Sequence, residues 1–425
     1  MARQMKDSGI EWMGQIPEKW KVQRAKTLFS QRLTKGNQYT VLLAATQKHG
    51  MLPQSEVEGV VQVKEDADLQ QFHTVHKNDF VISLRSFQGG FEFSQYEGVC
   101  SPAYQVFYST KPICYSYYRM LFKSDGFIKK MNSLTVGIRD GKNIQYDDFA
   151  NSLVPVPPLK EQEHIASYLD RKCAEIDAII SKQQQIIEKL KEYKLSVITE
   201  AVTKGLDPNV PMKDSGVEWI EEIPEKWQKA KLKNTCQFIN GDRSSNYPSP
   251  NDYVDKGIPF LGADSLCGRY VDIAQSKKIT NEKYRSMGGA KIQKGDILYT
   301  LRGSTIGKNA MAMFDDGTVA SSLMVIRPIS LVPKFLLYWL NSEEEFQQRQ
   351  SYINGSTAPN LSADNVGTFI LFLPSTVEQL RIANFLDKKC NEIELAIQKK
   401  QRMIEKLSDY KKSLIYEVVT GKKEV

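Results

Sequence analysis

The chain has 425 residues, of which 41% are hydrophobic and 25% charged, as expected for a globular protein of roughly two to four domains. A formal net charge of +7 permits binding to nucleic acid without requiring it. Because the sequence contains no signal-peptide pattern and no run of about 18 apolar residues, we expect a cytoplasmic protein without membrane spans.

The chain contains the same frame twice. The leading segment, residues 5–20, returns as residues 212–227 with four substitutions. A second element, residues 170–203, returns as residues 387–420 with identical residues at 19 of 34 positions. The chain is therefore a tandem duplication. Since the stretches between the copies have diverged, we expect two similar frames that present two different binding surfaces.

Two tryptophans and the isoleucine of the I-P pair recur in each leading segment. We interpret them as packing anchors beneath a domain rather than as groups that stack on bases. They are Trp12, Ile16 and Trp20 in the first copy and Trp219, Ile223 and Trp227 in the second.

Two inserts of mixed α/β character lie between the frames, at about residues 21–158 and 228–374. Their short apolar runs, separated by turn residues, predict strands. Residues 78–86 resemble residues 294–304, so that Arg85 lies opposite Arg302 just after a predicted strand. This similarity indicates one ancestral fold that has diverged in its loops, as binding surfaces do.

Each insert also has its own basic region, at residues 111–142 and 277–308. Such a region can bind nucleic acid, and the alternative is a solvated surface that is rich in lysine.

The repeated elements predict two long helices. From Leu169 and from Leu386, mainly apolar residues recur at alternating steps of four and three, which is the seam of a coiled coil. The polar seam residues coincide in the two copies, Gln183 with Lys400 and Lys194 with Lys411, and such residues typically set register. We predict an antiparallel intramolecular pair rather than intermolecular zippers, because the duplication then creates an internal pseudo-twofold axis. The second helix should end beside the segment that begins at Met5.

No catalytic motif is found in the sequence. The only Pro-Pro pair follows Val156, whereas an amino-methyltransferase would carry Asn or Asp before it. Residues 303–309 have three residues between their glycines, one fewer than a phosphate-binding loop. Asp79 and Asp296 fall at matching strand starts, where we expect turn or capping roles.

Metal and disulfide sites are not expected either. His73 and His76 form an HxxH pattern with no cysteine nearby, so the end of a surface strand is the simpler interpretation. The six cysteines show no CxxC spacing, and we interpret them as buried free thiols.

Three features of the sequence resemble the specificity (S) subunit of Type I restriction-modification systems. They are the repeated K-D-S-G-x-x-W-x-x-x-I-P-x-x-W segments, the P-L-x-E-Q-x-x-I-A start of the first helix at residues 158–166, and the helix after each insert. The stretches GIRDGKNI at 137–144 and NGSTAPNLS at 354–362 hold equivalent places. The resemblance covers essentially the whole chain, although the second helix start, at 374–383, lacks the double proline.

The resemblance implies an α+β fold with two pseudo-symmetric mixed α/β target recognition domains, separated by two long antiparallel helices that form a coiled coil. The expected boundaries are 1–158 for the first recognition domain, 159–205 for the first helix, 206–375 for the linker, second leading segment and second recognition domain, and 376–425 for the second helix.

The resemblance also implies a non-catalytic subunit that binds double-stranded DNA. It would read a bipartite asymmetric target and position modification (methyltransferase) and restriction/translocase subunits on it. No cofactor is expected in this chain, whereas S-adenosylmethionine, ATP and Mg are expected on the partner subunits. Two alternatives remain open: a coiled-coil scaffold that binds protein partners, and an enzyme with a cryptic site.

Loop residues of each recognition domain are the predicted DNA contacts. Arg and Lys can bind guanine edges, Asn and Gln adenine edges, and Ser or Thr either edges or phosphate. The alternative for any of them is a solvated loop residue. The candidates in the first domain are Arg85, Ser86, Gln88, Arg139, Lys142 and Asn143. Those in the second are Arg302, Ser304, Thr305, Lys308, Ser356, Thr357 and Asn360.

Overall fold

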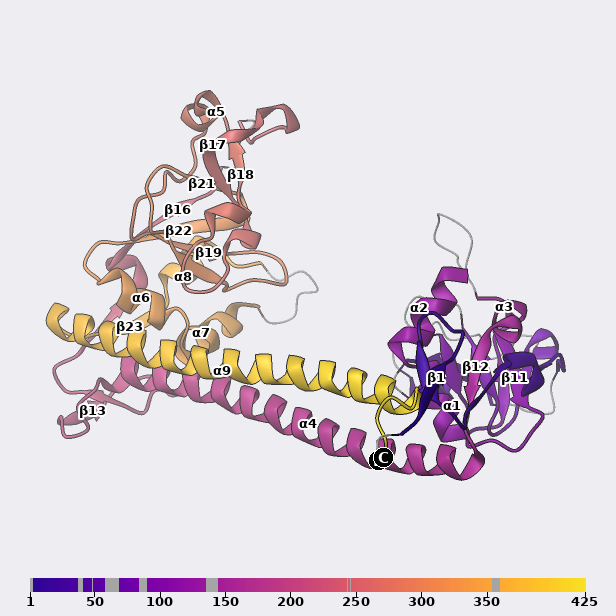
Figure 1. Cartoon of the computed structure of the whole chain (residues 1–425). Coiled ribbons are helices and arrows are strands. Elements are labelled where there is room, and N and C mark those ends of the chain that lie inside the picture. Colours follow the sequence, from indigo (N-terminus) through magenta and orange to yellow (C-terminus); the bar gives the residue numbers. More distant parts are fainter. Residues whose placement is uncertain are drawn as a thin grey trace. The chain divides into compact units, whose positions relative to one another are not determined.

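Figure 1 shows the computed structural model of the chain. It describes residues 3–36, 41–47, 49–57, 69–83, 90–134, 144–242, 244, 246–353 and 360–425. The chain divides into two compact units: the first unit contains residues 1–184 and 402–425, and the second unit contains residues 185–401. Each unit therefore combines one insert with parts of both long helices.

A small β-hairpin leads into each unit. In the first, strands β1 (Met5–Asp7) and β2 (Gln15–Pro17) pair antiparallel, and the Asp7 carboxylate accepts a 3.0 Å hydrogen bond from the backbone N–H of Gly9. The second hairpin, β13 (Met212–Asp214) with β14 (Glu222–Pro224), has the equivalent bond to Asp214 at 2.8 Å. Because Asp readily caps a tight turn in this way, the repeated D-S-G sequence specifies the turn locally.

The first unit contains a four-stranded antiparallel sheet in the order β4-β11-β8-β9. Phe29, Phe80, Phe91 and Phe107 from this sheet pack with aromatic residues of the helices in one core, largely edge to face. The strands are β4 (Phe29–Arg32), β8 (Phe80–Ile82), β9 (Phe91–Phe93) and β11 (Gln105–Ser109), and the helices are α1 (Tyr115–Phe122), α2 (Asp125–Leu134) and α3 (Tyr146–Asn151). Three strand pairs complete the unit: β3 (Lys21–Arg24) with β12 (Leu153–Val156), β5 (Leu43–Thr46) with β6 (Gly50–Pro53), and β7 (His73–Val75) with β10 (Gly98–Cys100).

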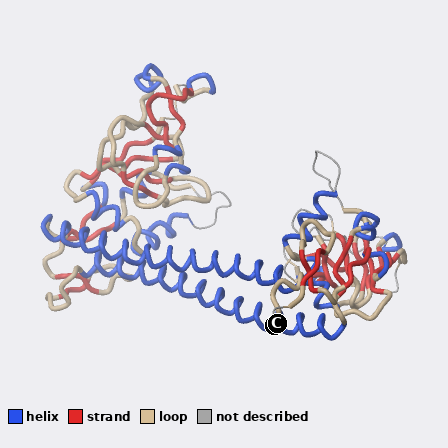
Figure 2. Tube along the Cα trace, viewed as in Figure 1, coloured by secondary structure: helices blue, strands red, loops and turns tan. Residues whose placement is uncertain are grey.

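The second unit repeats this sheet in the matching order β16-β22-β19-β20. Figure 2 shows the helices and strands of the chain by colour. Its strands are β16 (Cys236–Asn240), β19 (Ile297–Thr300), β20 (Asn309–Met311) and β22 (Leu323–Pro328), and its helices are α6 (Pro333–Trp339), α7 (Glu343–Ile353) and α8 (Ala363–Gly367). A three-stranded sheet joins β17 (Tyr253–Leu261), β18 (Lys277–Ile279) and β21 (Thr318–Val319) near α5 (Asn281–Ser286), and β15 (Gln228–Lys231) pairs with β23 (Ile370–Leu373). The predicted α+β fold of two related inserts is confirmed.

The long helices are α4 (Leu159–Lys204) and α9 (Thr376–Val419). In the second unit Lys194 of α4 donates a 2.6 Å hydrogen bond to Glu394 of α9, and a Cβ built at Gly205, just after α4, would lie 3.2 Å from Glu378 near the start of α9. The helices are therefore antiparallel within one chain, as predicted. In the first unit Lys411 binds Asp177 in the same way, with both oxygens at 2.6 Å. Each seam lysine thus reaches a carboxylate of the opposite helix.

A buried glutamine fixes the start of each long helix. Gln162 donates to the carbonyl of Pro157 (2.8 Å) and accepts from the N–H of Cys114 just before α1 (2.9 Å). Gln379 makes the matching bonds to Pro374 and Val332. The start of α9 therefore makes the same two hydrogen bonds as the start of α4, although it lacks the double proline.

The end of α9 contacts the first hairpin. Tyr117 Oη donates a 2.8 Å hydrogen bond to the carbonyl of Val419. A Cβ built at Gly421, which has φ +72°, would lie 3.0 Å from the ring of Trp20, and the Arg3 guanidinium lies 5.6 Å from the same ring. Residues near both ends of the chain therefore share one buried tryptophan, as the pseudo-twofold repeat predicts.

The packing role predicted for the tryptophans holds with one exception. Trp12 packs against Phe127 at 6.3 Å, and a Cβ built at Gly126 would lie 2.4 Å from the Trp12 ring. Gly126 is the second residue of α2, and the second residue of α7 is Glu344. Glu344 forms a side-chain hydrogen bond with Trp219, and Trp219 is 50% exposed. The prediction is wrong for Trp219, whereas Trp20, Trp227, Ile16 and Ile223 are buried.

Asp79 and Asp296 are buried at matching positions just before β8 and β19. Arg32 of β4 binds both oxygens of Asp79 at 2.7 and 2.9 Å, and Arg327 of β22 binds both oxygens of Asp296 at 2.8 and 2.7 Å. Each carboxylate also accepts a backbone N–H from three residues earlier. These contacts are the capping role expected from the sequence, and the two units supply the arginine from different strands.

Replacing Arg327 with Leu should lower the free energy of unfolding by about 3 kcal/mol, because the buried Asp296 carboxylate would lose its charged partner. Arg171→Leu, which breaks an exposed pair with Glu175, is the matched control and should change it by less than about 1 kcal/mol. Urea unfolding followed by fluorescence measures both. Equal losses in the two variants would contradict the buried-pair interpretation, and adding Asp296→Asn to Arg327→Leu should recover part of the loss.

Candidate functional site

Five of the thirteen candidate DNA contacts lie in the described part of the chain, all in the second unit. The others are outside the described residues: Arg85, Ser86, Gln88, Arg139, Lys142, Asn143, Ser356 and Thr357. Four of the described five, Arg302, Ser304, Thr305 and Lys308, belong to the loop that connects β19 to β20, here called the β19–β20 loop (residues 301–308), and their side chains are exposed.

Backbone hydrogen bonds close the β19–β20 loop into a compact turn. The N–H of Thr300 donates to the carbonyl of Lys308 and the N–H of Gly307 donates to the carbonyl of Thr300, both at 2.9 Å. Gly303 and Gly307 have φ of +83° and +85°, in the left-handed region that favours glycine. The glycines that faintly resemble a phosphate-binding loop therefore shape a hairpin turn.

The fifth described candidate, Asn360, lies beside this loop. Asn360 and Arg302 form an isolated antiparallel bridge, and the N–H of Leu361 donates to the carbonyl of Leu301 at 2.9 Å. The structure thus brings together candidates from two segments that are far apart in the sequence. An exposed guanidinium and an exposed carboxamide in one place are suited to bind base edges or phosphates.

The first unit has a matching hairpin. Strands β8 and β9 pair antiparallel, and the N–H of Ser83 donates to the carbonyl of Gly90 at 2.7 Å. The chain that connects them includes the candidates Arg85, Ser86 and Gln88, outside the described residues. The predicted correspondence between residues 78–86 and 294–304 is confirmed at the level of strands, because β8 and β19 hold the same place in their sheets.

Several cations of the second basic region have partners within their own unit. Lys283 pairs with Asp252 at 3.2 Å, Lys277 lies over the ring of Tyr253 at 5.0 Å, and Lys291 donates to the carbonyl of Tyr284. Part of this charge therefore stabilises the local fold, while the side chain of Arg302 in the β19–β20 loop is exposed.

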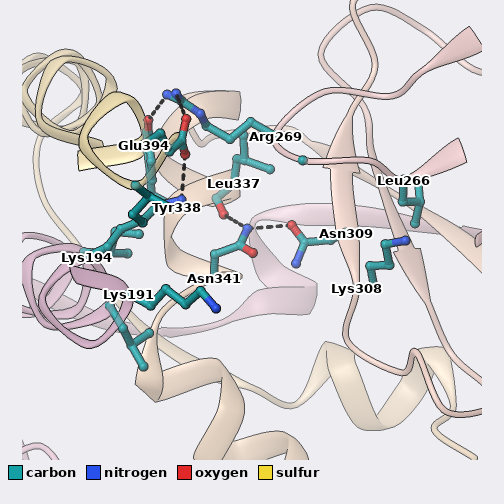
Figure 3. Close-up of a pocket in the computed structure, with 14 residues that line it drawn as sticks. Lys191, Lys194, Leu266, Arg269, Lys308, Asn309, Leu337, Tyr338, Asn341 and Glu394 are labelled. Atoms are coloured by element: carbon teal, nitrogen blue, oxygen red, sulfur yellow. Dashed lines mark hydrogen bonds and ion pairs between the residues drawn. The ribbon is translucent and has the colours of Figure 1, made fainter. Parts of the chain in front are cut away.

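A cavity of about 540 Å³ lies next to this loop, between the sheet and the long helices of the second unit (Figure 3). Lys191, Lys194, Arg269 and Lys308 line it, and Glu394 is the acidic residue among its lining residues. Arg269 donates to Glu394 and to Tyr338 Oη, both at 2.9 Å, and Lys308 donates to the carbonyl of Ala263 at 3.0 Å. The cavity wall is basic, which favours an anionic ligand or neighbour.

An aspartate on each long helix anchors the insert. Asp387 of α9 accepts from Tyr338 (2.7 Å) and Lys334 (2.5 Å) of α6, and Asp170 at the matching position of α4 accepts from Arg119 of α1 (2.9 Å). Burial alone would raise the pKa of Asp387, but the bonds from Lys334 and Tyr338 and the nearby positive charges outweigh it, and the pKa of Asp387 is lowered.

Asp387→Asn should therefore destabilise the protein in a pH-dependent manner. Because the folded-state pKa is lowered, the stabilisation is present above the ordinary Asp pKa of about 4 and is lost as pH falls through the lower folded-state value. Unfolding midpoints of wild type and variant should differ at neutral pH and converge in acid. Asp255→Asn, at an exposed carboxylate of the same unit, is the control. A wild-type to Asp387→Asn difference that stayed constant with pH would contradict the ion-pair role.

No alternative chemical site is evident in the described ranges. They contain no cluster of three or more His, Cys, Asp or Glu side chains placed to hold a metal. His73 begins β7 and His76 follows its end, as the strand-end interpretation predicts. All six cysteines are free, and Cys267 is exposed, contrary to the expectation of burial. No helix of the described ranges has the length and apolar composition needed to cross a bilayer.

The sequence matches a known protein family over most of its length. The family model for the Type I restriction modification DNA specificity domain matches twice, at residues 12–194 and 224–406. The chain belongs to this family. Each match spans one leading segment or its end, one insert and part of the following helix.

Relatives from bacteria and archaea agree with that assignment. The Type I restriction enzyme EcoBI specificity subunit of Escherichia coli is 30% identical over 51% of this chain, and the chain spans about half of that relative, 47%. The MjaVIII specificity subunit of Methanocaldococcus jannaschii is 24% identical over 82% of this chain and 80% of its own.

Solved structures share the fold. One, described as the structural basis underlying complex assembly and conformational transition of the type I R-M system, has TM-score 0.73 at 16% identity and covers 95% of this chain and 98% of its own. The HsdS subunit from Thermoanaerobacter tengcongensis has TM-score 0.53 at 16% identity, covering 96% and 98%.

The sequence did not reveal the residues that anchor the cavity wall. Arg269 and Tyr338 are far in the chain from Glu394 and Asp387, and no short motif contains them. Only the repeat offset offers a signal, since Asp170 and Asp387 occupy matching helix positions.

Proposed function

We propose that this chain is the DNA-reading subunit of a Type I restriction-modification complex. Each unit would read one half of a bipartite asymmetric target in double-stranded DNA. The carrying observation is the duplicated specificity domain, in which the sheet order is the same in both units while the loops differ. Two units that share a fold but differ in their loops are suited to bind two different half-sites.

The described loop of the second unit supports this function. Arg302 and Asn360 lie together, Lys308 of the same loop lines a cavity with Lys191, Lys194 and Arg269, and these side-chain types are the ones that bind phosphates and base edges. The exposed residues of the β19–β20 loop are held at one end of a rigid hairpin, which is how loops on a scaffold present binding groups.

The chemistry would belong to partner subunits. We propose that this chain is not an enzyme and that it positions modification (methyltransferase) subunits and restriction/translocase subunits on the DNA. S-adenosylmethionine, ATP and Mg would be bound by those partners. This view is supported by the absence of a recognisable catalytic motif in the sequence.

An exchange of inserts tests the proposal. Replacing residues 21–158 with the corresponding insert of a relative whose target is known should change one half of the methylated sequence and leave the other half unchanged. The reciprocal exchange of residues 228–374 should change only the other half. Single-molecule sequencing of methylated bases, with the modification subunit present, measures both. If either exchange altered both halves, the modular reading would be wrong, and a chain that bound no duplex DNA with that subunit would favour a protein scaffold.

Substitutions in the β19–β20 loop should separate base contacts from phosphate contacts. Arg302→Ala should cost about 1 to 3 kcal/mol for the preferred base pair and relax specificity there, as expected for loss of a bidentate base contact. Lys308→Ala should weaken binding to all sequences and reduce the salt slope by about 1. Binding titrations at several salt concentrations measure these effects. Lys226→Ala, at an exposed lysine of the second hairpin, is the control, and an equal loss in that variant would contradict the loop assignment.

A further inference from the structure

A buried polar network lies directly beneath the β19–β20 loop. Tyr299 of β19 donates its hydroxyl to Glu345 of α7, and Arg349 of α7 binds the same carboxylate through Nε at 3.0 and 3.3 Å. Tyr299 is fully buried and Glu345 is 2% exposed. Burial raises the pKa of Glu345, although Arg349 and Tyr299 act in the opposite direction, so the carboxylate is costly to bury.

The network contacts the loop through Arg349. A Cβ built at Gly307 would lie 2.4 Å from Nε and 2.6 Å from Cζ of Arg349. The guanidinium therefore lies against the backbone of Gly307, and a side chain at this position would have to displace it. Because Glu345 holds Arg349 and Tyr299 orients Glu345, the position of the far end of the loop depends on all three side chains.

The first unit has apolar residues at the positions that match Tyr299, Glu345 and Arg349. Tyr299 is the third residue of β19, and Glu345 and Arg349 are the third and seventh residues of α7. The third residue of β8 and the third and seventh residues of α2 are Ile82, Phe127 and Met131, which are all buried in the apolar core. An apolar core at these positions is thus compatible with the fold, so packing alone does not require an ion pair in the second unit.

We propose that Tyr299, Glu345 and Arg349 are positioning residues that hold the β19–β20 loop in the conformation that reads the second half-site. The inference rests on the proposed function and deepens it. Specificity for that half-site would depend on an ion pair beneath the reading surface, through the geometry it imposes on Arg302 and its neighbours.

The experiment compares four variants of the full chain, each assembled with the modification subunit. Arg349→Met introduces the residue of the first unit and breaks the ion pair. The triple variant Tyr299→Ile, Glu345→Phe, Arg349→Met copies the whole apolar arrangement. Gly307→Ala disturbs the same contact from the loop side. Arg285→Met, at an exposed arginine of α5, is the control for loss of charge.

Thermal unfolding and single-molecule mapping of methylated sites are measured for each variant. Arg349→Met and Gly307→Ala should relax base preference in the second half-site by about tenfold and leave the first half-site unchanged. The triple variant should unfold at a temperature closer to wild type than Arg349→Met does, because no buried charge remains, yet its second half-site should stay relaxed. Arg285→Met should behave as wild type.

The outcomes separate the two levels of the proposal. If Arg349→Met or the triple variant lowered stability or overall methylation while base preference in the second half-site stayed as in wild type, the residues would be structural only and the inference would be overturned. If Arg349→Met failed to fold, the triple variant would decide by the same criterion. Wild-type chain that conferred no sequence preference on methylation would instead overturn the proposed function and this inference with it.

Discussion

The apolar seam between α4 and α9 is the interaction on which the rest of the structure depends. A long helix with one apolar stripe is stable in water only when that stripe is covered, and most helical stability comes from such packing. In the first unit Ile176 of α4 and Leu414 of α9 belong to the same core as the sheet. In the second unit Ile198 and Leu386 do so. The largest core of each unit is therefore completed by helix segments that lie far apart in the sequence, whereas smaller apolar clusters lie within each insert.

Charge sets the register of this seam. Lys194 with Glu394 and Lys411 with Asp177 join the two helices at positions related by the repeat. A slip of one helical turn would remove each lysine from its carboxylate, which is unfavourable. The same helices carry Asp170 and Asp387, which bind Arg119 of α1 and Lys334 of α6. The carboxylates that fix the helix register, Asp177 and Glu394, thus lie about two turns from those that hold the inserts, Asp170 and Asp387.

The two units have the same strand arrangement, but different side chains stabilise matching positions in it. Asp79 and Asp296 keep their places, yet their arginines come from β4 in one unit and β22 in the other. A buried carboxylate requires a nearby cation and not a particular strand, so a substitution that supplies the cation from a neighbour is tolerated. The β19–β20 loop follows the same logic, because its support is ionic where the first unit is apolar. Loops can then diverge without loss of the frame.

Much of the architecture was determined by local sequence. The helices follow from apolar periodicity and the hairpins from the D-S-G turn, because each signal lies within a few residues of its structural effect. The candidate loop was found for the same reason, since Arg302 and Lys308 flank turn glycines. Tertiary structure alone decided which arginine neutralises Asp296, that Trp219 is exposed, and that Asn360 lies beside Arg302. These outcomes depend on which side chains meet across strands and helices after folding, and residues distant in the sequence leave no local pattern that reveals such contacts.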